Sequence, residues 1–449
     1  MTNLPAVFRE RMRTKLGDEF SAFHSSLQEV SPVSIRLNPR KQNKIVAADP
    51  VPWTKFGRYL SERPKFTFDP LFHAGTYYVQ EASSMFIEQI FRQHITGSPL
   101  TILDLSAAPG GKSTHILNLI DDKSLLVSNE VIRSRASILA ENILKWGYPS
   151  SIVTNNDPAD FERLPGFFDV IVVDAPCSGE GLFRKEPESS NEWSVENVNL
   201  CSSRQRRILA DVWPALKENG ILIYSTCTYN DDENEKNLTW LQENQDVEFL
   251  SIDVDVSWGV VESNANSVKG YRFYPHRVKG EGFFIAAIRK REPARDNSKV
   301  KKTLTTASKK IKETLSAWVN NSNAFEFFQH DDYLFIFPAN QINSLEFVKQ
   351  NLRIVQAGTT LASTKHDKVI PEHGSAMSIY LNDGNFNSVE LDLPHALQYL
   401  RRETFEWLDQ PKGFQLIKYE GVPLGWINSL GNRFNNLYPI DWRIRSQER

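Results

Sequence analysis

Two of the three cysteines directly follow short apolar runs that are typical of buried strands. Pro176-Cys177-Ser178-Gly179 comes after Phe168–Val173, and Thr226-Cys227-Thr228 comes after Gly220–Tyr224. A thiolate is a strong nucleophile, and nearby donors or cations lower the pKa of a thiol. A lone cysteine is more often a small buried apolar residue. Two cysteines at adjacent strand ends, beside Asp174, instead indicate covalent chemistry.

A run of small residues, Leu103–Ser113 with the sequence LDLSAAPGGKS, joins an apolar stretch to a helical pattern at His115–Ile120. Such a turn lets backbone N–H groups approach a ligand at a helix N-terminus, which suits a nucleotide-like molecule. The phosphate-binding loop of ATPases requires a glycine where Ser106 stands. A dinucleotide fingerprint requires glycines in place of Ala107-Ala108-Pro109. A plain connection between a strand and a helix remains the alternative.

Two acids follow the next two expected strands. Glu130 comes after the second strand, where a carboxylate can accept both ribose hydroxyls of a nucleoside. Asp157 comes after the third strand and can accept from an adenine amino group. The alternatives are a surface acid for Glu130 and a helix or turn cap before Pro158 for Asp157.

The elements that position these residues alternate along the chain. The expected strands are 101–105, 124–128, 151–154, 168–173 and 220–224, and the expected helices include 133–145 and 204–216. This alternation predicts an α/β fold with a parallel, doubly wound sheet. Ligands of such sheets bind beyond the carboxyl ends of the strands, near the switch in strand order. Every residue singled out above, together with Asp104, lies at such an end.

The length of 449 residues predicts two to four domains. A hydrophobic content of 40% with 24% charged residues is that of a globular protein, and no apolar run is long enough for a membrane span. Three cysteines are too few for a disulfide framework, so we expect a cytoplasmic protein, with Cys201 as a buried apolar residue. The net charge of -3 neither supports nor excludes a nucleic-acid partner.

Residues 1–70 are expected to form a small N-terminal α+β module that binds RNA. Leu4–Leu16 has helical periodicity and Val33–Leu37 alternates like a strand. Aromatic residues that include Trp53 and Tyr59 are interleaved with basic ones. Such a mixture can stack on bases and hold phosphates. A small aromatic core with a charged rim is the alternative.

The C-terminal third shows no catalytic constellation. Residues 291–312 are rich in lysine and arginine and are expected to form a linker. We expect an intermediate domain at 313–375 and an accessory binding domain or a structural cap at 376–449, for which the family resemblance described next implies RNA binding. The segment 414–426 has the pattern of a β-hairpin followed by a strand.

The segments DLSAAPGGKS, DAPCSGEGLFRKEPE, YSTCTYN, RFYPH and VQEASSM resemble the RNA (cytosine-5)-methyltransferases of the Sun (NSUN) family. Within that family the chain is most similar to the bacterial 16S ribosomal RNA methyltransferases. The similarity extends over residues 1–290, and the tail weakly resembles the PUA-like C-terminal domain of the family. Many relatives have a cysteine at the position of Ser106, where any small residue suffices.

The resemblance implies a Rossmann-like class I methyltransferase core at residues 71–290 that uses S-adenosylmethionine. It also implies a role for each candidate residue. The methionine part of the cofactor lies against Ser106, Ala107, Ala108, Pro109, Gly110, Gly111 and Lys112; the ribose meets Glu130, the adenine Asp157 and the sulfonium Asp174, with Arg135 assisting. Cys227 is then the nucleophile, and Cys177 helps to release the product.

The implied chemistry starts from carbon 5 of cytosine, which is a poor nucleophile. Addition of the Cys227 thiolate to carbon 6 gives carbon 5 enamine character, while Asp174 holds the ring. The base must leave its stack to permit this. The opposite assignment, with Cys177 as the nucleophile, is the alternative because DNA cytosine-5 enzymes attack from a Pro-Cys motif.

The leading substrate is 16S ribosomal RNA, alone or in the 30S subunit, and transfer RNA is the alternative. A non-catalytic RNA-binding or ribosome-assembly protein would need neither thiol, and an ATPase would need the missing glycine. Arg184 and Lys185 either hold the RNA backbone or form a plain surface pair. We expect a monomer that binds RNA but neither a membrane nor a metal ion.

Overall fold

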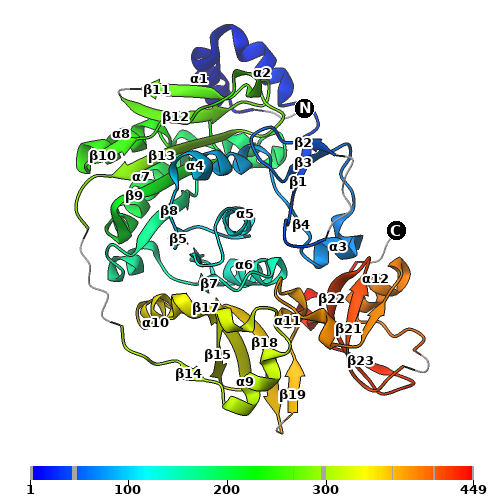
Figure 1. Ribbon diagram of the computed structural model, residues 1–449. Helices are drawn as coiled ribbons and strands as arrows, with labels where there is room; N and C mark the ends of the chain where they lie inside the picture. The colour runs from blue at the N-terminus through cyan, green and yellow to red at the C-terminus, as the bar shows by residue number, and fades with distance from the viewer. Residues whose placement is uncertain are drawn as a thin grey trace.

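The computed structural model describes residues 4–42, 48–265, 267–294, 300–366, 368–407 and 410–446. At its centre lies a ten-stranded sheet with the order β11-β12-β13-β9-β8-β5-β6-β7-β17, in which β10 also pairs with β13 (Figure 1). The five parallel strands in the middle are β5 (Thr101–Asp104), β6 (Leu125–Asn129), β7 (Ser151–Thr154), β8 (Phe168–Asp174) and β9 (Leu216–Thr226). The predicted doubly wound α/β sheet is confirmed.

Helices cover both faces of this sheet, so β5, β6 and β7 are buried at every residue. This explains why these strands have continuous apolar sequences rather than alternating ones. The helices are α4 (Ile87–His94), α5 (Gly111–Leu119), α6 (Arg133–Trp146), α7 (Val195–Val212) and α8 (Glu235–Asn244). Helix α7 begins nine residues before the predicted start, because the Ser194 side chain caps it by accepting from the Asn197 N–H at 3.1 Å.

The strand order reverses between β5 and β8. From β5 the chain continues outward to β6 and β7, whereas β8 is followed by β9 on the other side. The loops after β5 and β8 therefore diverge and leave the crevice in which doubly wound sheets bind ligands. Antiparallel strands extend the sheet beyond β9: β13 (Phe283–Lys290), β12 (Val268–Phe273), β11 (Val261–Ala265) and β10 (Val247–Phe249).

The residues of the predicted N-terminal module, 1–70, form a helical part and a sheet. Helices α1 (Ala6–Leu16) and α2 (Phe20–Ser26) pack against the domain of the central sheet, in a cluster with Phe183, Trp193 and Tyr229. The following sheet extends beyond residue 70. It consists of β2 (Asp49–Pro50), β3 (Gly57–Leu60), β1 (Val33–Leu37) and β4 (Tyr77–Val79), with α3 (Pro70–His73) between β3 and β4.

The aromatic residues of this N-terminal sheet mostly form a core. Trp53 and Tyr59 are buried, and the Trp53 indole donates to the carbonyl of Ala82 at 2.8 Å. Trp53 also contacts Phe273 from the central sheet. Neither side chain can stack on a base, because neither exposes its ring face.

A third sheet follows the central sheet along the chain. Its strands are β14 (Thr305–Thr306), β15 (Phe325–His330), β16 (Tyr333–Pro338), β18 (Thr359–Lys365) and β19 (Lys368–Pro371), with helices α9 (Lys309–Ser316) and α10 (Ile342–Asn351). Strand β17 (Ile354–Ala357) leaves this region and pairs antiparallel with β7 (Figure 1). The predicted intermediate domain therefore completes the central sheet and is not separate from it.

The predicted linker at 291–312 is also shorter than expected. Strand β14 and the start of α9 fall inside it, because Thr305–Thr306 pairs with Phe328–Gln329. Residues 295–299 of that linker lie outside the described residues.

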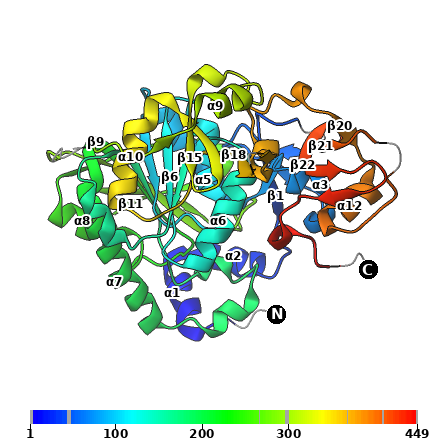
Figure 2. The same ribbon diagram turned by 90° about the horizontal axis from the view of Figure 1, so that it is seen from below.

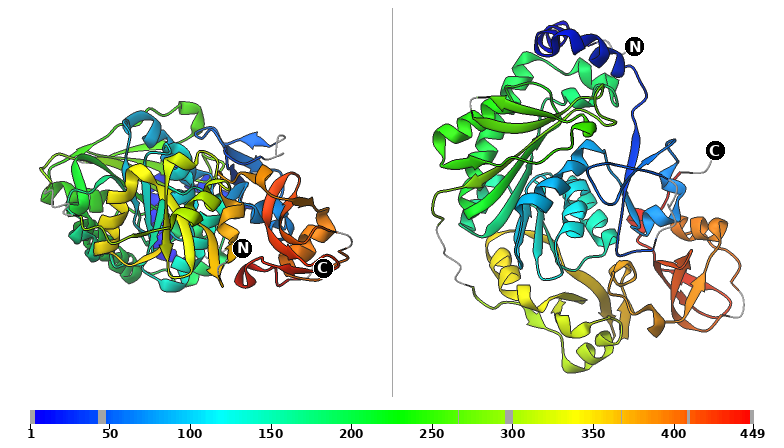
Figure 3. Two further views of the ribbon diagram at one scale, coloured as in Figure 1. Left: turned by 60° about the horizontal axis from the view of Figure 1, so that its bottom comes forward. Right: turned by 45° about the horizontal axis from the view of Figure 1, so that its top comes forward.

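The C-terminal sheet contains β20 (Ser388–Glu390), β21 (Gly413–Tyr419), β22 (Val422–Ser429) and β23 (Phe434–Asn436), with helices α11 (His373–Met377) and α12 (Leu393–Arg401). It packs beside the N-terminal sheet, where Ile35 and Tyr77 share a cluster with Leu397 and Ile417 (Figures 2 and 3). Helix α12 ends at Arg401 because Arg402 adopts a left-handed conformation. Within the described ranges, no helix is both long and apolar enough to cross a membrane.

Candidate functional site

The two cysteines lie side by side at the carboxyl ends of paired strands. Strands β8 and β9 are parallel neighbours, with Asp174 opposite Ser225. The Sγ atoms of Cys177 and Cys227 are 2.9 Å apart, and the Cys227 N–H donates to the Cys177 Sγ at 3.3 Å. Both cysteines are free thiols and half-buried. The predicted juxtaposition is confirmed.

The Cys177 thiol is held against its neighbour and away from solvent. The hydrogen bond with Cys227, and then burial, raise the pKa of the Cys177 thiol well above its usual value, and the charge of Glu233 adds to this. Cys177 therefore keeps its proton at neutral pH and can donate to its neighbour.

Two buried carboxylates fasten the cysteine loops to each other. Glu180, from the Cys177 loop, accepts from the Tyr229 N–H at 2.9 Å and from the Asn230 side chain at 3.1 Å. Glu233, which follows the Cys227 loop, accepts from the Ser178 N–H at 2.9 Å. Each loop thus holds the other through charge-assisted hydrogen bonds, which restricts both thiols to one arrangement.

The predicted cofactor loop lines a cavity of about 200 Å³ in the crevice between β5 and β8. Its wall consists of Asp104, Ser106–Pro109, Gly111, Lys112, Asp174, Tyr78–Glu81 and Ser84. Gly110, with φ +117°, turns the chain into α5, a conformation that other residues rarely adopt. The first N–H groups of α5 are therefore directed to this end of the sheet.

Asp104 is the buried acid of this cavity. Its Oδ2 accepts from the Ser113 hydroxyl at 2.6 Å, whereas its Oδ1 has no hydrogen-bond partner. Burial raises the pKa of Asp104 to about 7. A buried acceptor without a partner is costly unless a ligand satisfies it. The sequence placed Asp104 at a strand end, but it gave no signal that one of its oxygens would lack a partner.

Asp174 stands between the cavity and the thiols. Its Oδ2 lies 2.8 Å from the Lys112 Nζ, and its Oδ1 accepts from the Ser225 hydroxyl at 2.7 Å. Lys112 comes from the loop after β5, and Ser225 from the strand that carries Cys227. Asp174 therefore connects the loop that would hold a cofactor with the strand that holds the thiol.

Glu130 and Arg135 lie at the end of β6, as predicted. Glu130 is buried and accepts from the Ile132 N–H at 3.0 Å. Arg135 donates to the Ala108 carbonyl at 2.9 Å, and its Nη1 lies 3.6 Å from the Glu130 Oε2. Arg135 thus ties the loop after β5 to the loop after β6.

Asp157 is exposed and caps the short helix Pro158–Arg163, accepting from the Ala159 N–H at 3.1 Å. The capping role that the sequence left open is therefore present. The loop that carries Asp157 is held by the C-terminal region. Asn156 donates to the Arg353 carbonyl at 3.1 Å and accepts from the Arg353 N–H at 3.0 Å. No pattern in the sequence predicts this contact between Asn156 and Arg353.

Arg184, Lys185 and Cys201 are the remaining residues that the sequence singled out. Arg184 is buried and donates to Glu281 at 2.9 Å, so both predicted surface roles are wrong for it. Lys185 is exposed. Cys201 is buried in α7, as expected.

A groove of about 1180 Å³ adjoins the cavity. Its walls include residues 29–34, 60–63, 184–187 and 275–279, and the segment Val79–Glu81 borders both hollows. Exposed cations line it at Arg63, Lys185 and Lys279, among acids at Glu29, Glu62 and Glu186. An extended ligand in the groove would therefore lie beside the cavity.

Comparisons with known proteins agree with this geometry. A family model described as 16S rRNA methyltransferase RsmB/F matches residues 98–289. Models of the N-terminal domain of 16S rRNA methyltransferase RsmF and of the methyltransferase RsmF PUA domain match residues 4–82 and 386–444.

Individual proteins are similar over nearly the whole chain. Ribosomal RNA small subunit methyltransferase F of Enterobacter sp. is 31% identical, covering 97% of this chain and 95% of that protein. The protein of the same name from Pectobacterium atrosepticum is 30% identical, with coverages of 98% and 96%. The solved structure of a methyltransferase homolog protein from Pyrococcus horikoshii is 27% identical with a TM-score of 0.55, covering 64% of this chain and 96% of that one.

Proposed function

The chain belongs to the RsmF family of 16S rRNA methyltransferases, and from this premise we propose that it methylates carbon 5 of cytosine in 16S ribosomal RNA through a covalent bond from Cys227 to the base. The observation that carries the proposal is the pair of Cys177 and Cys227, with Sγ atoms 2.9 Å apart beside Asp174. Methyl transfer to an already nucleophilic atom, or RNA binding alone, would need no thiol at this place. Ribosomal RNA as the substrate would place the reaction in the cytoplasm.

The residues of the cavity fit S-adenosylmethionine, which when bound supplies an electrophilic methyl group. The Asp104 Oδ1 without a partner suits the ammonium of an amino acid, because a cation can satisfy a buried carboxylate. We assign the methionine part to Ser106–Lys112, the ribose to Glu130 and the adenine to Asp157. Asp174 lies beside the sulfonium, and Arg135 holds the loop that surrounds the cofactor.

The proposed reaction begins when the Cys227 sulfur adds to carbon 6 of the flipped cytosine. Asp174, held by Lys112 and Ser225, accepts from the exocyclic amine and keeps the ring in place. Carbon 5 then has enamine character and can accept the methyl group. A water molecule takes the carbon 5 proton, and the electron pair of that C–H bond restores the carbon 5–carbon 6 double bond and expels the Cys227 sulfur as a thiolate. Cys177, which keeps its proton, assists this departure directly or through water.

The groove supports an RNA substrate. Its exposed cations Arg63, Lys185 and Lys279 suit phosphate groups, and its wall at Val79–Glu81 continues into the cavity. A nucleotide flipped out of a strand in the groove would therefore be close to the cofactor. The PUA domain matched at 386–444 is a second candidate for RNA contact.

The test is transfer of labelled methyl groups to 16S RNA, both naked and in 30S subunits. Wild-type protein is compared with Cys227→Ala, Cys177→Ala and the control Cys201→Ala. We expect label at carbon 5 of cytosine with wild type and the control, none with Cys227→Ala, and a covalent adduct that persists with Cys177→Ala.

Other results would overturn parts of the proposal. If Cys177→Ala abolishes the adduct and Cys227→Ala keeps it, the two thiols have the opposite roles. Label in transfer RNA alone would change the substrate. Binding of S-adenosylmethionine without transfer to any RNA would favour an RNA-binding or ribosome-assembly protein.

A further inference from the structure

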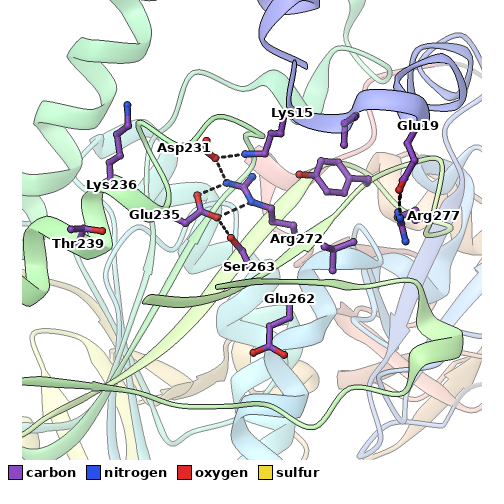
Figure 4. Close-up of a pocket in the computed structure, with 13 residues that line it drawn as sticks. Lys15, Glu19, Asp231, Glu235, Lys236, Thr239, Glu262, Ser263, Arg272 and Arg277 are labelled. Atoms are coloured by element: carbon purple, nitrogen blue, oxygen red, sulfur yellow. Dashed lines mark hydrogen bonds and ion pairs between the residues drawn. The ribbon is translucent and has the colours of Figure 1, made fainter. Parts of the chain in front are cut away.

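The segment RFYPH, residues 272–276, has no role in the reaction described above, yet it lies next to the Cys227 loop. A cavity of about 540 Å³ separates α1 and α8 from the hairpin of β11 and β12. A network of charged side chains, Lys15, Asp231, Glu235 and Arg272, lies in one wall of this cavity (Figure 4).

Arg272 is the centre of this network. It is 4% exposed and its Nε donates to the Glu235 Oε1 at 2.8 Å, while its Nη2 donates to both Glu235 and, at 2.7 Å, Asp231. Its remaining nitrogen, Nη1, donates to the carbonyl of Tyr229 at 2.7 Å. The two carboxylates fix the guanidinium plane, and this fixes the direction in which Nη1 points.

A second cation reaches the same carbonyl from the N-terminal helix. The Lys15 Nζ on α1 donates to the Tyr229 carbonyl at 3.1 Å and forms an ion pair with Asp231. Tyr229 is two residues beyond Cys227. Two cations from elements far apart in the sequence thus converge on one backbone oxygen of the Cys227 loop.

The opposite side of the loop is held by the Cys177 loop. The Gly181 N–H donates to the Cys227 carbonyl at 2.9 Å, and Glu180 accepts from the Tyr229 N–H. Hydrogen bonds therefore hold the loop Cys227–Asp231 from two sides. Arg272 and Lys15 donate the hydrogen bonds on the side that faces α1.

We infer that Arg272 is a positioning residue for the Cys227 thiol, and that Lys15 makes the docking of helix α1 part of the same support. This inference rests on the proposed role of Cys227. The network contains two cations, Lys15 and Arg272, and two anions, Asp231 and Glu235, so its charges balance. It therefore sets where the loop lies rather than how readily the thiol ionises.

The experiment measures how fast the protein forms a covalent adduct with RNA that contains 5-fluorocytosine. Fluorine replaces the proton that must leave carbon 5, so the adduct is trapped after methylation. Arg272→Met should slow adduct formation by about a hundredfold, because displacement of a reacting atom by about 1 Å costs a factor of this size. Arg272→Lys, which keeps one donor, should form the adduct about tenfold faster than Arg272→Met. Lys15→Met should form it about threefold to tenfold more slowly than wild type.

The control variant is Arg13→Met on the same helix. Arg13 pairs with Glu10 on the exposed surface and does not contact the loop, so its rate should stay within about twofold of wild type. Cofactor affinity and the KM for RNA should be unchanged in Lys15→Met and Arg272→Lys. The pH midpoint of adduct formation should also be unchanged, whereas an electrostatic role would shift it.

Wild-type rates in both Lys15→Met and Arg272→Lys would overturn the inference. So would a fall in rate that is matched by an equal fall in bound cofactor, because that result indicates general unfolding. If Arg272→Met fails to fold, the rates of adduct formation in Lys15→Met and Arg272→Lys still test the inference. Absence of an adduct in the wild type would instead overturn the proposed function.

Discussion

The two halves of the crevice are held by different kinds of interaction. On the nucleophile side, the loops after β8 and β9 are fixed by the buried charges of Glu180, Glu233 and Arg272. On the side of the proposed cofactor, the loops after β5, β6 and β7 are connected by neutral amides and by one exposed cation, Arg135, which donates to the Ala108 carbonyl at 2.9 Å. Asn129 donates to the carbonyls of Leu105 and Asn156 at 3.2 and 3.0 Å.

The difference follows from what each side has to hold. Charge-assisted hydrogen bonds are short and directional, so they suit the proposed covalent step, in which a sulfur atom meets one carbon atom. Buried charges are costly unless each has partners, and this explains the many contacts of Glu180 and Glu233. Neutral amides suffice where a ligand binds over a larger area. They also leave Asp104 as the acceptor that a cationic ligand can use.

Segments that come before and after the central sheet in the sequence also contact the two sides. Helix α1 contacts the nucleophile side through Lys15, while β17 and Arg353 contact the cofactor side. Variants on each side should therefore affect different steps.

The largest effect is expected from Glu180→Ala on the nucleophile side. The change removes the acceptor of the Tyr229 N–H and of the Trp193 and Asn230 side chains, at 2.9, 3.0 and 3.1 Å. We expect the free energy of unfolding to fall by about 3 kcal/mol and adduct formation to slow by about a hundredfold. Urea denaturation and adduct trapping measure these quantities.

The matched variant is Glu180→Gln, which keeps an acceptor and should recover most of the stability. Cofactor affinity should be unchanged in Glu180→Gln. A loss of affinity equal to the loss of rate would show that the two sides are not independent.

A smaller effect, on cofactor affinity instead of the rate of adduct formation, is expected from Asn156→Ala on the cofactor side. It removes both hydrogen bonds to Arg353 and loosens the loop that carries Asp157. We expect affinity for S-adenosylhomocysteine to fall about fivefold to tenfold, close to the value of one or two hydrogen bonds. Calorimetric titration measures it. Adduct formation at saturating cofactor should be unchanged, and a slower rate there would contradict the division.

The pH dependence of cofactor binding should come from Asp104. Its pKa of about 7 means that it is largely protonated at pH 6 and largely ionised at pH 8. A ligand ammonium favours the ionised form, so affinity for S-adenosylhomocysteine should rise about tenfold over this interval. In Asp104→Asn the rise should disappear, and its persistence would point to another group.

The same raised pKa has a consequence for the unliganded protein. Because the folded-state pKa lies above the unfolded value, the contribution of Asp104 to stability is fully present below pH 4 and is lost as the pH rises through 7. Bound ligand should reverse this loss. Thermal melting between pH 6 and pH 8 checks both expectations: the melting temperature should fall as the pH rises without S-adenosylhomocysteine, and this fall should be reversed with it.

The smallest effect is expected from Cys201→Ala. Cys201 is buried in α7, and its thiol has only a long contact, 3.9 Å, to Asn197. Activity should stay within about twofold, and stability should change by about 1 kcal/mol, the value of one small buried group. Loss of activity would mean that a third thiol takes part.

The sequence was informative wherever the pattern is local. Strands β1 and β7 have the predicted bounds, and the placement of Cys177 and Cys227 followed from the rule that parallel strands end at one edge. The motif resemblance identified the family. These inferences need only neighbouring residues and a small set of fold rules.

The sequence could not show contacts between distant segments. Strand β17 joins β7 although its four residues have no feature that distinguishes them from a strand of the third sheet. Arg184 looked like a surface cation because its partner Glu281 lies far along the chain. The buried network around Arg272 depends on α1 in the same way.

Strand β17 also has a consequence for how the protein is made. Without it, β7 would be an edge strand with unpaired N–H and C=O groups, which other chains can pair with. Ile354 pairs with Thr154, so this edge stays open while about 200 further residues are synthesised, which takes about 10–40 s. A nascent chain would therefore pass through an interval of exposure to aggregation, which ends when its own later segment covers the edge.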